Sequence, residues 1–138
     1  MKKSVRLFTL IELLIVIVIL GALAAMVAPR LAGRSEQARR RIAKADIESN
    51  ISLALKMYEV DNGAYPSTEQ GLAALLSKPS SEPVPQNWNG PYLEKKALDP
   101  WGNEYQYRYP GTSNAESYDL FSKGPDGTEG GEDDIKNW

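Results

Sequence analysis

The chain begins with a strongly apolar segment that contrasts with everything after it. Between Leu7 and Pro29 apolar residues follow one another almost without interruption, and the one charge among them is Glu12. A helix of about 22 residues spans roughly 33 Å, which matches the ~30 Å core of a bilayer. The pattern predicts a membrane-crossing helix, and a carboxylate inside such a helix typically has a function and a partner.

A helical repeat of apolar residues follows this segment. Beyond Pro29 they recur at spacings of three and four, which is typical of one face of an α-helix. The sequence predicts one long helix from about Phe8 to Val60, ended by the breaker at residues 61–63, with Gly21 and Pro29 as places where it can bend or melt locally. The face consists of Ile47, Ile51, Ala54, Leu55 and Tyr58.

Shorter elements are predicted after the long helix. Ser67 or Thr68 is positioned to cap a short helix. Residues 79–91 are rich in Pro, Ser and Asn and indicate a surface loop. Strands are predicted at residues 105–109, which alternate with period two, and at residues 118–122. We therefore expect an α+β domain in which a small antiparallel sheet packs against the long helix.

Charge and composition exclude several classes of function. The first 44 residues hold nine basic and two acidic side chains, whereas residues 46–138 hold seven basic and sixteen acidic ones. An acidic domain argues against nucleic-acid binding, because phosphate neutralisation requires clustered Lys and Arg. The chain has no His and no Cys, which removes the commonest general base and every thiolate metal ligand. We expect no enzymatic activity.

The N-terminal motif resembles the class III signal of type IV pilins and their relatives. The run from Phe8 to Leu13 follows a short basic leader that contains Lys2, Lys3 and Arg6. The resemblance implies that a prepilin peptidase cuts before Phe8 and methylates the new amine. It also implies that Glu12 pairs with the amine of a neighbouring subunit, and that Gly21 and Pro29 are assembly positions where the helix softens.

The residue before the implied cleavage site departs from the family. The family has Gly there, whereas this chain has Leu7. Because recognition by the peptidase depends on that small residue, the departure argues against efficient cleavage between Leu7 and Phe8. The resemblance divides the chain into a basic leader at 1–7, a hydrophobic membrane and assembly helix at 8–29, and a periplasmic head at 30–138.

Motifs in the second half resemble the major pseudopilins of type II secretion systems, the general secretion pathway protein G family. They are Asn62-Gly63-Ala64-Tyr65-Pro66, Leu98-Asp99-Pro100-Trp101-Gly102-Asn103, Ser122-Lys123-Gly124-Pro125-Asp126-Gly127 and Asp133-Asp134-Ile135. The resemblance implies a type IV pilin-like fold. It also implies a single-pass inner-membrane protein with a periplasmic head, which polymerises into a periplasmic filament that helps export folded proteins across the outer membrane. The implied partners are further copies of this chain, minor pseudopilins, the inner-membrane assembly platform and prepilin peptidase.

The segment from Asp126 to Asp134 is crowded with carboxylates and glycines. Oxygen ligands of this kind suit Ca²⁺, although the spacing does not match an EF-hand. The resemblance implies a Ca²⁺ site with the side chains of Asp126, Asp133 and Asp134 as ligands, joined by backbone oxygens of Lys123 and Thr128. The alternative is a solvated acidic tail.

Other interpretations stay open at this point. A secretory signal peptide cut after Ala24 would release a soluble Ca²⁺-dependent protein, and a plain membrane anchor would need no processing. A minor type IV pilin, a competence pseudopilin or an adhesin-like subunit would share the N-terminal helix and differ in the head. The aromatic residues Trp88, Tyr92 and Trp101 either line a ligand pocket or pack onto the helix, and we expect packing.

Overall fold

The computed structural model describes residues 8–138, apart from the side chains of residues 27–32. The chain divides into two compact units, Met1–Gln37 and Ala38–Trp138. The prediction that falls on Leu7 lies outside the described residues. The two units are treated separately below.

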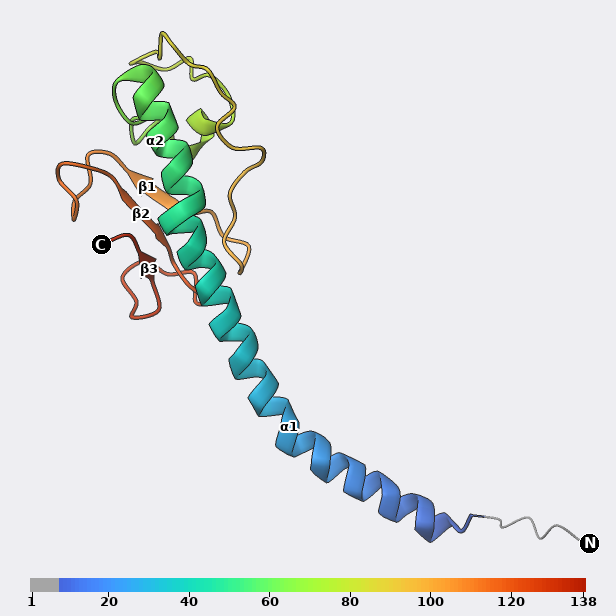
Figure 1. Ribbon diagram of the computed structural model, residues 1–138. Helices are drawn as coiled ribbons and strands as arrows, with labels where there is room; N and C mark the ends of the chain where they lie inside the picture. Colours follow the sequence, from blue (N-terminus) through green and yellow to red (C-terminus); the bar gives the residue numbers. More distant parts are fainter. Residues whose placement is uncertain (1–7) are drawn as a thin grey trace, which may run out of the picture. The chain divides into compact units, whose positions relative to one another are not determined.

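Helical structure runs through most of the predicted long helix, but in three pieces (Figure 1). The α-helix α1 spans Leu10–Ala45, the π-helical segment η1 spans Asp46–Asn50, and the α-helix α2 spans Ile51–Asn62. The predicted end is confirmed, because Gly63 follows in the left-handed conformation with φ 81° and donates its N–H to the carbonyl of Glu59.

The prediction of one regular α-helix is wrong at η1. There the N–H of Ile51 donates to the carbonyl of Asp46, five residues earlier, and the hydroxyl of Ser52 donates to the carbonyl of Ile47. The side chain of Asn50 also donates to the Asp46 carboxylate at 2.7 Å. Local polar side chains therefore accompany a wider helical turn, as single π-turns inside α-helices commonly do.

Helix α1 continues without a break through Gly21 and Pro29. The softening expected at these positions belongs to assembly, so it stays a prediction. For the predicted membrane-crossing segment at residues 8–29, a search of the described residues finds no helix that is both long enough and apolar enough to cross a membrane.

The predicted short helix is a single 3₁₀ segment, η2, at Gly71–Leu75. Of the two predicted caps, Ser67 holds the turn at residues 68–70 that leads into η2, because its hydroxyl accepts the N–H of Gln70 at 3.2 Å, while η2 itself follows Gln70 without a side-chain cap. The side-chain oxygen of Gln70 accepts the backbone N–H of Ser67 at 3.1 Å in return. This reciprocal pair is a capping box, and it fixes the chain where η2 begins.

The sheet has three antiparallel strands in the order β1-β2-β3. Strand β1 spans Gln106–Arg108, β2 spans Asp119–Ser122, and β3 spans Ile135–Lys136. The first two lie inside the predicted strands. Strand β3 was not predicted, because two residues are too few to show a period.

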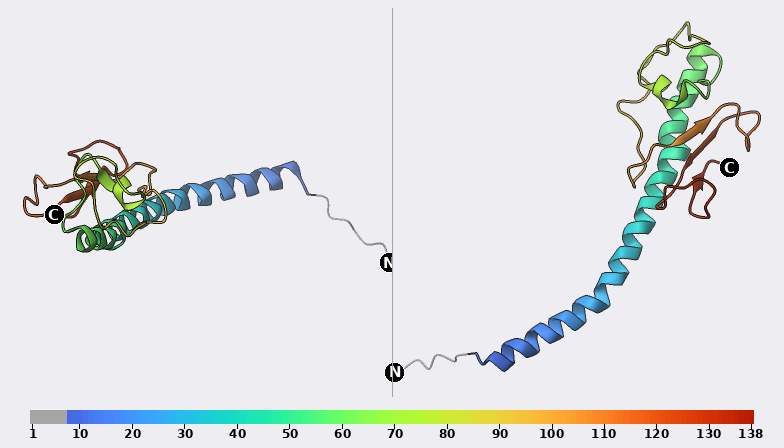
Figure 2. Two further views of the ribbon diagram at one scale, coloured as in Figure 1. Left: turned by 90° about the horizontal axis from the view of Figure 1, so that it is seen from above. Right: turned by 180° about the vertical axis from the view of Figure 1, so that it is seen from behind.

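The core of the second unit lies between the helical segment and the sheet. Figure 2 shows from two sides that the strands run beside the helix. The buried apolar side chains come from η1, α2, η2, β1 and β2 and include Ile47, Ile51, Leu55, Leu75, Tyr107 and Leu120. The expected α+β arrangement of a helix packed on a small antiparallel sheet is confirmed.

Two of the three aromatic residues singled out above pack as expected. The indole N–H of Trp88 donates to the carbonyl of Ala74 at 2.9 Å, and its ring meets that of Tyr92 edge to face. The Tyr92 ring in turn packs edge to face against Tyr58 of α2. Both residues therefore help to pack the loop onto the core.

Candidate functional site

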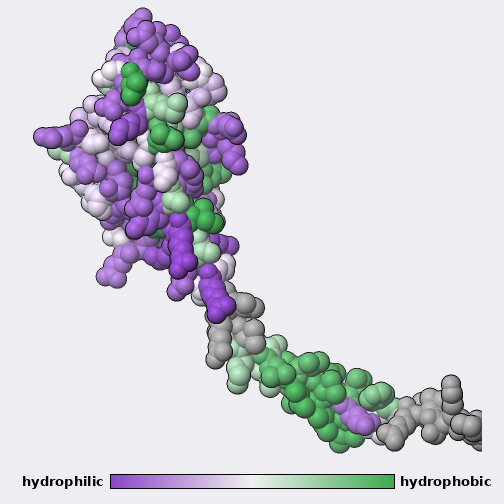
Figure 3. All heavy atoms as spheres, viewed as in Figure 1, coloured by the Kyte–Doolittle hydropathy of each residue, from purple (hydrophilic) through white to green (hydrophobic). Residues whose placement is uncertain are grey.

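The N-terminal part of α1 carries large apolar side chains that the chain itself does not cover. At least half of the side-chain surface of nearly every large apolar residue from Phe8 to Met26 is exposed. Figure 3 shows this segment as a continuous hydrophobic surface, whereas the second unit is mostly hydrophilic. A monomeric soluble protein rarely exposes so large an apolar patch, so this surface is a candidate interaction site.

Glu12 and Thr9 form a capping box at the start of α1. The carboxylate of Glu12 accepts the backbone N–H of Thr9 at 3.0 Å and the Thr9 hydroxyl at 3.1 Å. The backbone N–H of Glu12 donates to the Thr9 hydroxyl at 3.3 Å. In the single chain, Glu12 therefore stabilises the end of its own helix. The Thr-x-x-Glu spacing of a capping box is present in the sequence, whereas the resemblance to pilins implied only a partner of Glu12 in another subunit.

The other predicted assembly and processing residues lie apart from this box. Phe8 is exposed and precedes the helix, while Gly21 lies within α1 with open space around it. Pro29 also lies within α1. Nothing in the structure tests cleavage between Leu7 and Phe8 or methylation of Phe8.

The acidic loop, residues 123–134, joins β2 to β3 and holds the predicted metal ligands. Asp126 lies at its surface, where its carboxylate accepts the backbone N–H of Thr128 at 2.8 Å and the Thr128 hydroxyl at 2.7 Å. These two bonds, the backbone one first, lower the pKa of Asp126 below its usual range. The carboxylate is therefore held ionised.

Asp133 lies in a cradle formed by two glycines. A Cβ on Gly131 would come within 2.4 Å of the Asp133 carboxylate and 3.5 Å of the Asp126 carboxylate. A Cβ on Gly124 would come within 2.5 Å of the Asp133 carbonyl oxygen and 2.9 Å of its carboxylate. Glycine at both positions leaves room for the oxygens of Asp126 and Asp133 to lie near one another.

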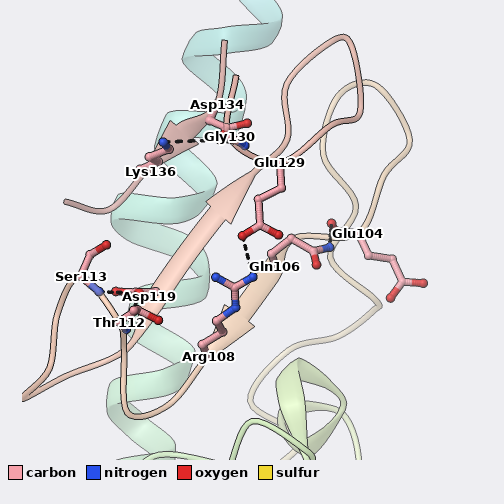
Figure 4. Close-up of polar contacts among 10 residues, drawn as sticks. All are labelled: Glu104, Gln106, Arg108, Thr112, Ser113, Asp119, Glu129, Gly130, Asp134 and Lys136. Carbon is pink, nitrogen blue, oxygen red and sulfur yellow. Dashed lines mark hydrogen bonds and ion pairs between the residues drawn. The ribbon is translucent and has the colours of Figure 1, made fainter. Parts of the chain in front are cut away.

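Asp134 is the most deeply buried carboxylate of the loop, with a side chain that is 1% exposed. Its Oδ2 accepts the N–H of Gly130 at 2.9 Å and faces the ammonium of Lys136 at 3.4 Å (Figure 4). Its Oδ1 is buried and has no hydrogen-bond partner among the described residues. A buried carboxylate oxygen without a partner is costly, so it is a candidate position for a cation.

The acidic loop contains the types of ligand atom that a hard cation prefers, but their arrangement fits a cation less clearly. Carboxylate and carbonyl oxygens are the ligands that Ca²⁺ prefers, and the orphaned Oδ1 of Asp134 is an oxygen that a cation could coordinate. Within the described residues, however, no three Asp, Glu, His or Cys side chains are arranged as a ready metal cluster. The structure brings Asp126 and Asp133 together, while the Oδ2 of Asp134 is bonded to Gly130 and Lys136.

An ion pair ties the acidic loop to the sheet. The guanidinium of Arg108 on β1 contacts the carboxylate of Glu129 at 2.6 Å (Figure 4). It also lies 5.5 Å from the centre of the Phe121 ring. Both charged side chains are partly exposed, so the pair contributes ~1 kcal/mol or less. The pair therefore helps to position the loop beside the sheet, but it adds little to the stability of the fold.

A buried carboxylate, Asp119 on β2, organises the neighbouring loop. It accepts the N–H groups of Thr112, Ser113 and Asn114 at 2.6, 2.8 and 2.9 Å. Burial alone would raise the pKa of Asp119, but these N–H groups and the nearby Arg108 outweigh it and hold the pKa below its usual range. The sequence analysis missed this residue, because an isolated Asp in a strand carries no recognisable pattern.

Comparison with known proteins places these features in a family. Residues 30–138 match the family model described as type II secretion system (T2SS), protein G. The chain is 55% identical over 135 residues to the type II secretion system core protein G of Pseudomonas aeruginosa, a match covering 95% of this chain and 93% of the other. It is 47% identical to the core protein G of Escherichia coli, over 95% of this chain and 89% of the other.

A solved structure agrees with these matches. The fold is similar to the crystal structure of the major pseudopilin from the type 2 secretion system of enterohaemorrhagic Escherichia coli, with a TM-score of 0.70 and 43% identity. The match covers 78% of this chain and 89% of that chain. The similarity to a pseudopilin predicted from the motifs is confirmed, and the chain belongs to the type II secretion system protein G family.

Proposed function

We propose that this chain is the major structural subunit of a type II secretion pseudopilus, a periplasmic filament that helps export folded proteins across the outer membrane. The observation that carries the proposal is the apolar surface of α1 from Phe8 to Met26. That surface has to be covered by lipid or by other proteins. The match to core protein G supports a major subunit over a minor pilin, a competence pseudopilin or an adhesin.

A second exposed surface supports assembly through the head. On α2, Leu53, Met57 and Val60 follow one another at helical spacing, and each is more than half exposed. Together with Pro91 and Tyr92 they line a hollow of about 430 Å³. Apolar side chains placed in this way are typical of a surface that packs against a partner. We assign it to contacts within the filament, with copies of this chain or with minor pseudopilins.

Before assembly, we place the chain in the inner membrane as a single-pass protein with its head in the periplasm. This part of the proposal rests on the family and on the apolar side chains of α1, and not on a membrane-spanning helix identified in the structure. Prepilin peptidase would have to accept Leu7 in place of the family's Gly to remove residues 1–7 and methylate Phe8, and an assembly platform would then extract the chain. The intact mass of subunits in sheared filaments tests the processing step, because an unprocessed Met1 terminus would contradict it.

We also propose that the acidic loop binds Ca²⁺ through the side chains of Asp126, Asp133 and Asp134 and the carbonyls of Lys123 and Thr128. The cation would supply positive charge to a loop whose carboxylates otherwise repel one another. The support is the orphaned buried Oδ1 of Asp134 and the pair of glycines around Asp133. The role of the ion would be structural, as would that of the whole chain, for which we propose no catalysis.

Filament formation tests the main proposal. In cells that produce the secretion apparatus, Leu14→Asp should abolish filaments, because it places a charge on the apolar surface of α1. Lys78→Asp changes a charge at an exposed position after η2, outside the hollow beside α2, and serves as a control that keeps both apolar surfaces intact. Filaments of normal length and number from the Leu14→Asp variant would overturn the proposal.

Calcium binding has its own test. A ligand that binds only the folded state raises the melting temperature, so the full chain in detergent should melt at a higher temperature with Ca²⁺ than with chelator. The double variant Asp133→Ala and Asp134→Ala should lose this difference. Equal melting temperatures of the wild-type chain in both conditions would contradict the calcium site without affecting the assembly proposal.

A further inference from the structure

A buried carboxylate outside the acidic loop is connected to the start of that loop. Asp99 is 4% exposed and Ser122 is 0% exposed, although both are polar. The Ser122 hydroxyl donates to Oδ2 of Asp99 at 2.6 Å. Neither residue belongs to the predicted ligand set. A buried polar pair of this kind is costly to maintain unless every group is satisfied.

The other oxygen of Asp99 holds the turn in which Asp99 lies. Its Oδ1 accepts the N–H of Trp101 at 3.1 Å and the N–H of Asn103 at 2.8 Å. The backbone N–H of Asp99 also donates to the carbonyl of Asn103 at 2.8 Å. Because two N–H groups of the turn hold Oδ1 and a backbone bond closes the turn itself, Asp99 presents Oδ2 to Ser122 in a defined position.

Ser122 in turn positions the peptide group between Lys123 and Gly124. Its Oγ accepts the N–H of Gly124 at 3.1 Å, in a buried environment. That N–H belongs to the same planar trans peptide as the carbonyl of Lys123, so the two groups point in opposite directions. Anchoring the N–H on Ser122 therefore turns the Lys123 carbonyl away from Ser122 and fixes its orientation.

Gly124 completes the arrangement. It lies at φ 66°, in the left-handed region that favours glycine, and Asp133 packs directly against the position where a Cβ would stand. The peptide that Ser122 anchors is thus also the peptide against which Asp133 lies. The chain of contacts from Asp99 through Ser122 ends beside two of the proposed Ca²⁺ ligands, the Lys123 carbonyl and Asp133.

We propose that Asp99 and Ser122 are positioning residues that orient the Lys123 carbonyl for a divalent cation in the acidic loop. The inference rests on the calcium site of the proposed function. It assigns the role to the Asp-Pro-Trp-Gly-Asn turn, whose Asp99 holds Ser122 ready before any ion binds. Groups that orient metal ligands through hydrogen bonds commonly change metal affinity by roughly 10–100-fold when they are removed.

The test compares two serines whose hydroxyls each accept one backbone N–H. Ser122→Ala removes the proposed relay, while Ser67→Ala removes the bond to Gln70 in the turn before η2, distant in sequence from the acidic loop. Calorimetric titration of Ca²⁺ into the full chain in detergent should show affinity weakened at least tenfold by Ser122→Ala and unchanged by Ser67→Ala. A purely structural role for Ser122 would instead lower the melting temperature equally with Ca²⁺ and with chelator.

Asp99→Asn provides a second variant if Ser122→Ala does not fold. It keeps the oxygen that holds the turn but replaces the Oδ2 acceptor with an amide, so it should weaken Ca²⁺ binding by a smaller factor. If the wild-type chain binds Ca²⁺ and both folded variants bind it within twofold of the wild type, the inference is overturned while the calcium site stands. If the wild-type chain binds no Ca²⁺, the calcium site and the inference are both overturned.

Discussion

Two regions of the chain differ in how far their apolar side chains are buried: the segment from Phe8 to Met26 and the unit from Ala38 to Trp138. In the first region, the Leu, Ile and Val side chains of a helix surface are exposed. In the second, the apolar side chains of α2 and the sheet pack together in a buried core. Both follow from ordinary helical patterns. The second unit therefore has an apolar core made by its own side chains, whereas the apolar side chains of the first segment are left uncovered by the described chain.

The largest expected effect comes from placing the same substitution in both regions. Leu55 is 0% exposed and Leu14 is 55% exposed. Leu55→Ala should lower the free energy of unfolding by about 2–5 kcal/mol, because it leaves a cavity in the core. Leu14→Ala should change it by less than ~0.5 kcal/mol and reduce filament yield instead. Urea denaturation of the full chain in detergent, followed by Trp fluorescence, measures the free energy of unfolding of both variants. Equal losses of stability would contradict the difference between the two regions.

A smaller effect should come from the buried carboxylate of Asp119. Asp119→Asn replaces one carboxylate oxygen with an amide NH₂ group, which cannot accept the backbone N–H groups that the carboxylate accepts. The substitution should lower the free energy of unfolding by about 2 kcal/mol at neutral pH. Because the pKa of Asp119 lies below its usual range when folded, its contribution is complete above the unfolded pKa of ~3.9 and disappears as the pH falls through the folded value.

The pH dependence therefore sharpens this prediction. The difference in stability between the wild-type chain and Asp119→Asn should be constant between pH 5 and 7 and should shrink at lower pH, as measured by urea denaturation at each pH. Arg108 is the charged neighbour that lowers the pKa together with the backbone N–H groups. A difference that grows on acidification would contradict the assignment.

The π-helical turn offers a test of intermediate size. The hydroxyl of buried Tyr105 donates to Oδ2 of Asp46 at 2.9 Å and joins η1 to the residue before β1. Tyr105→Phe should cost about 1.5 kcal/mol, because it removes a hydrogen bond to a charged group. Asn50→Ala removes the more exposed bond to the same carboxylate and should cost less. Thermal unfolding distinguishes them, and a reversed order would show that η1 is held by Asn50.

The smallest effect should be local to the start of α1. Thr9→Ala removes the capping box and should cost about 1 kcal/mol in the first turn only. Hydrogen exchange should become faster for the first amides of α1 and stay unchanged in the head. Thr9→Ser keeps the hydroxyl and should behave as the wild-type chain does. Faster exchange throughout the head would contradict the separation of the two regions.

Much of the fold was predictable, because it follows from repeating patterns and strong breakers. The apolar face through Ile47, Ile51 and Leu55 predicted the buried side of the helix, and the Asn62-Gly63 pair predicted its end. The π-turn at Asp46–Asn50 was not predictable, because it depends on bonds between side chains and carbonyls that leave the apolar spacing almost unchanged. Strand β3 depends on pairing with β2, which its two residues do not reveal.

The motifs pointed to the acidic loop as a candidate site, but they did not show its contacts. Motif similarity identified the acidic loop, and the structure adds that Asp134 is bonded to Gly130 and Lys136 while Asp126 and Asp133 lie together. The roles of buried Asp99 and Asp119 were missed, since a charged residue in a short strand or turn normally indicates a solvated position. Both depend on backbone N–H groups that only the folded loop brings within reach.

The most direct test of the central claim is a cryo-electron microscopy structure of filaments sheared from cells that produce the chain. If the chain is the major filament subunit, the segment from Phe8 to Met26 should pack against the same segment of neighbouring subunits inside the filament, with the heads on the surface. Filaments built from this chain in which that segment lies on the outer surface would contradict it.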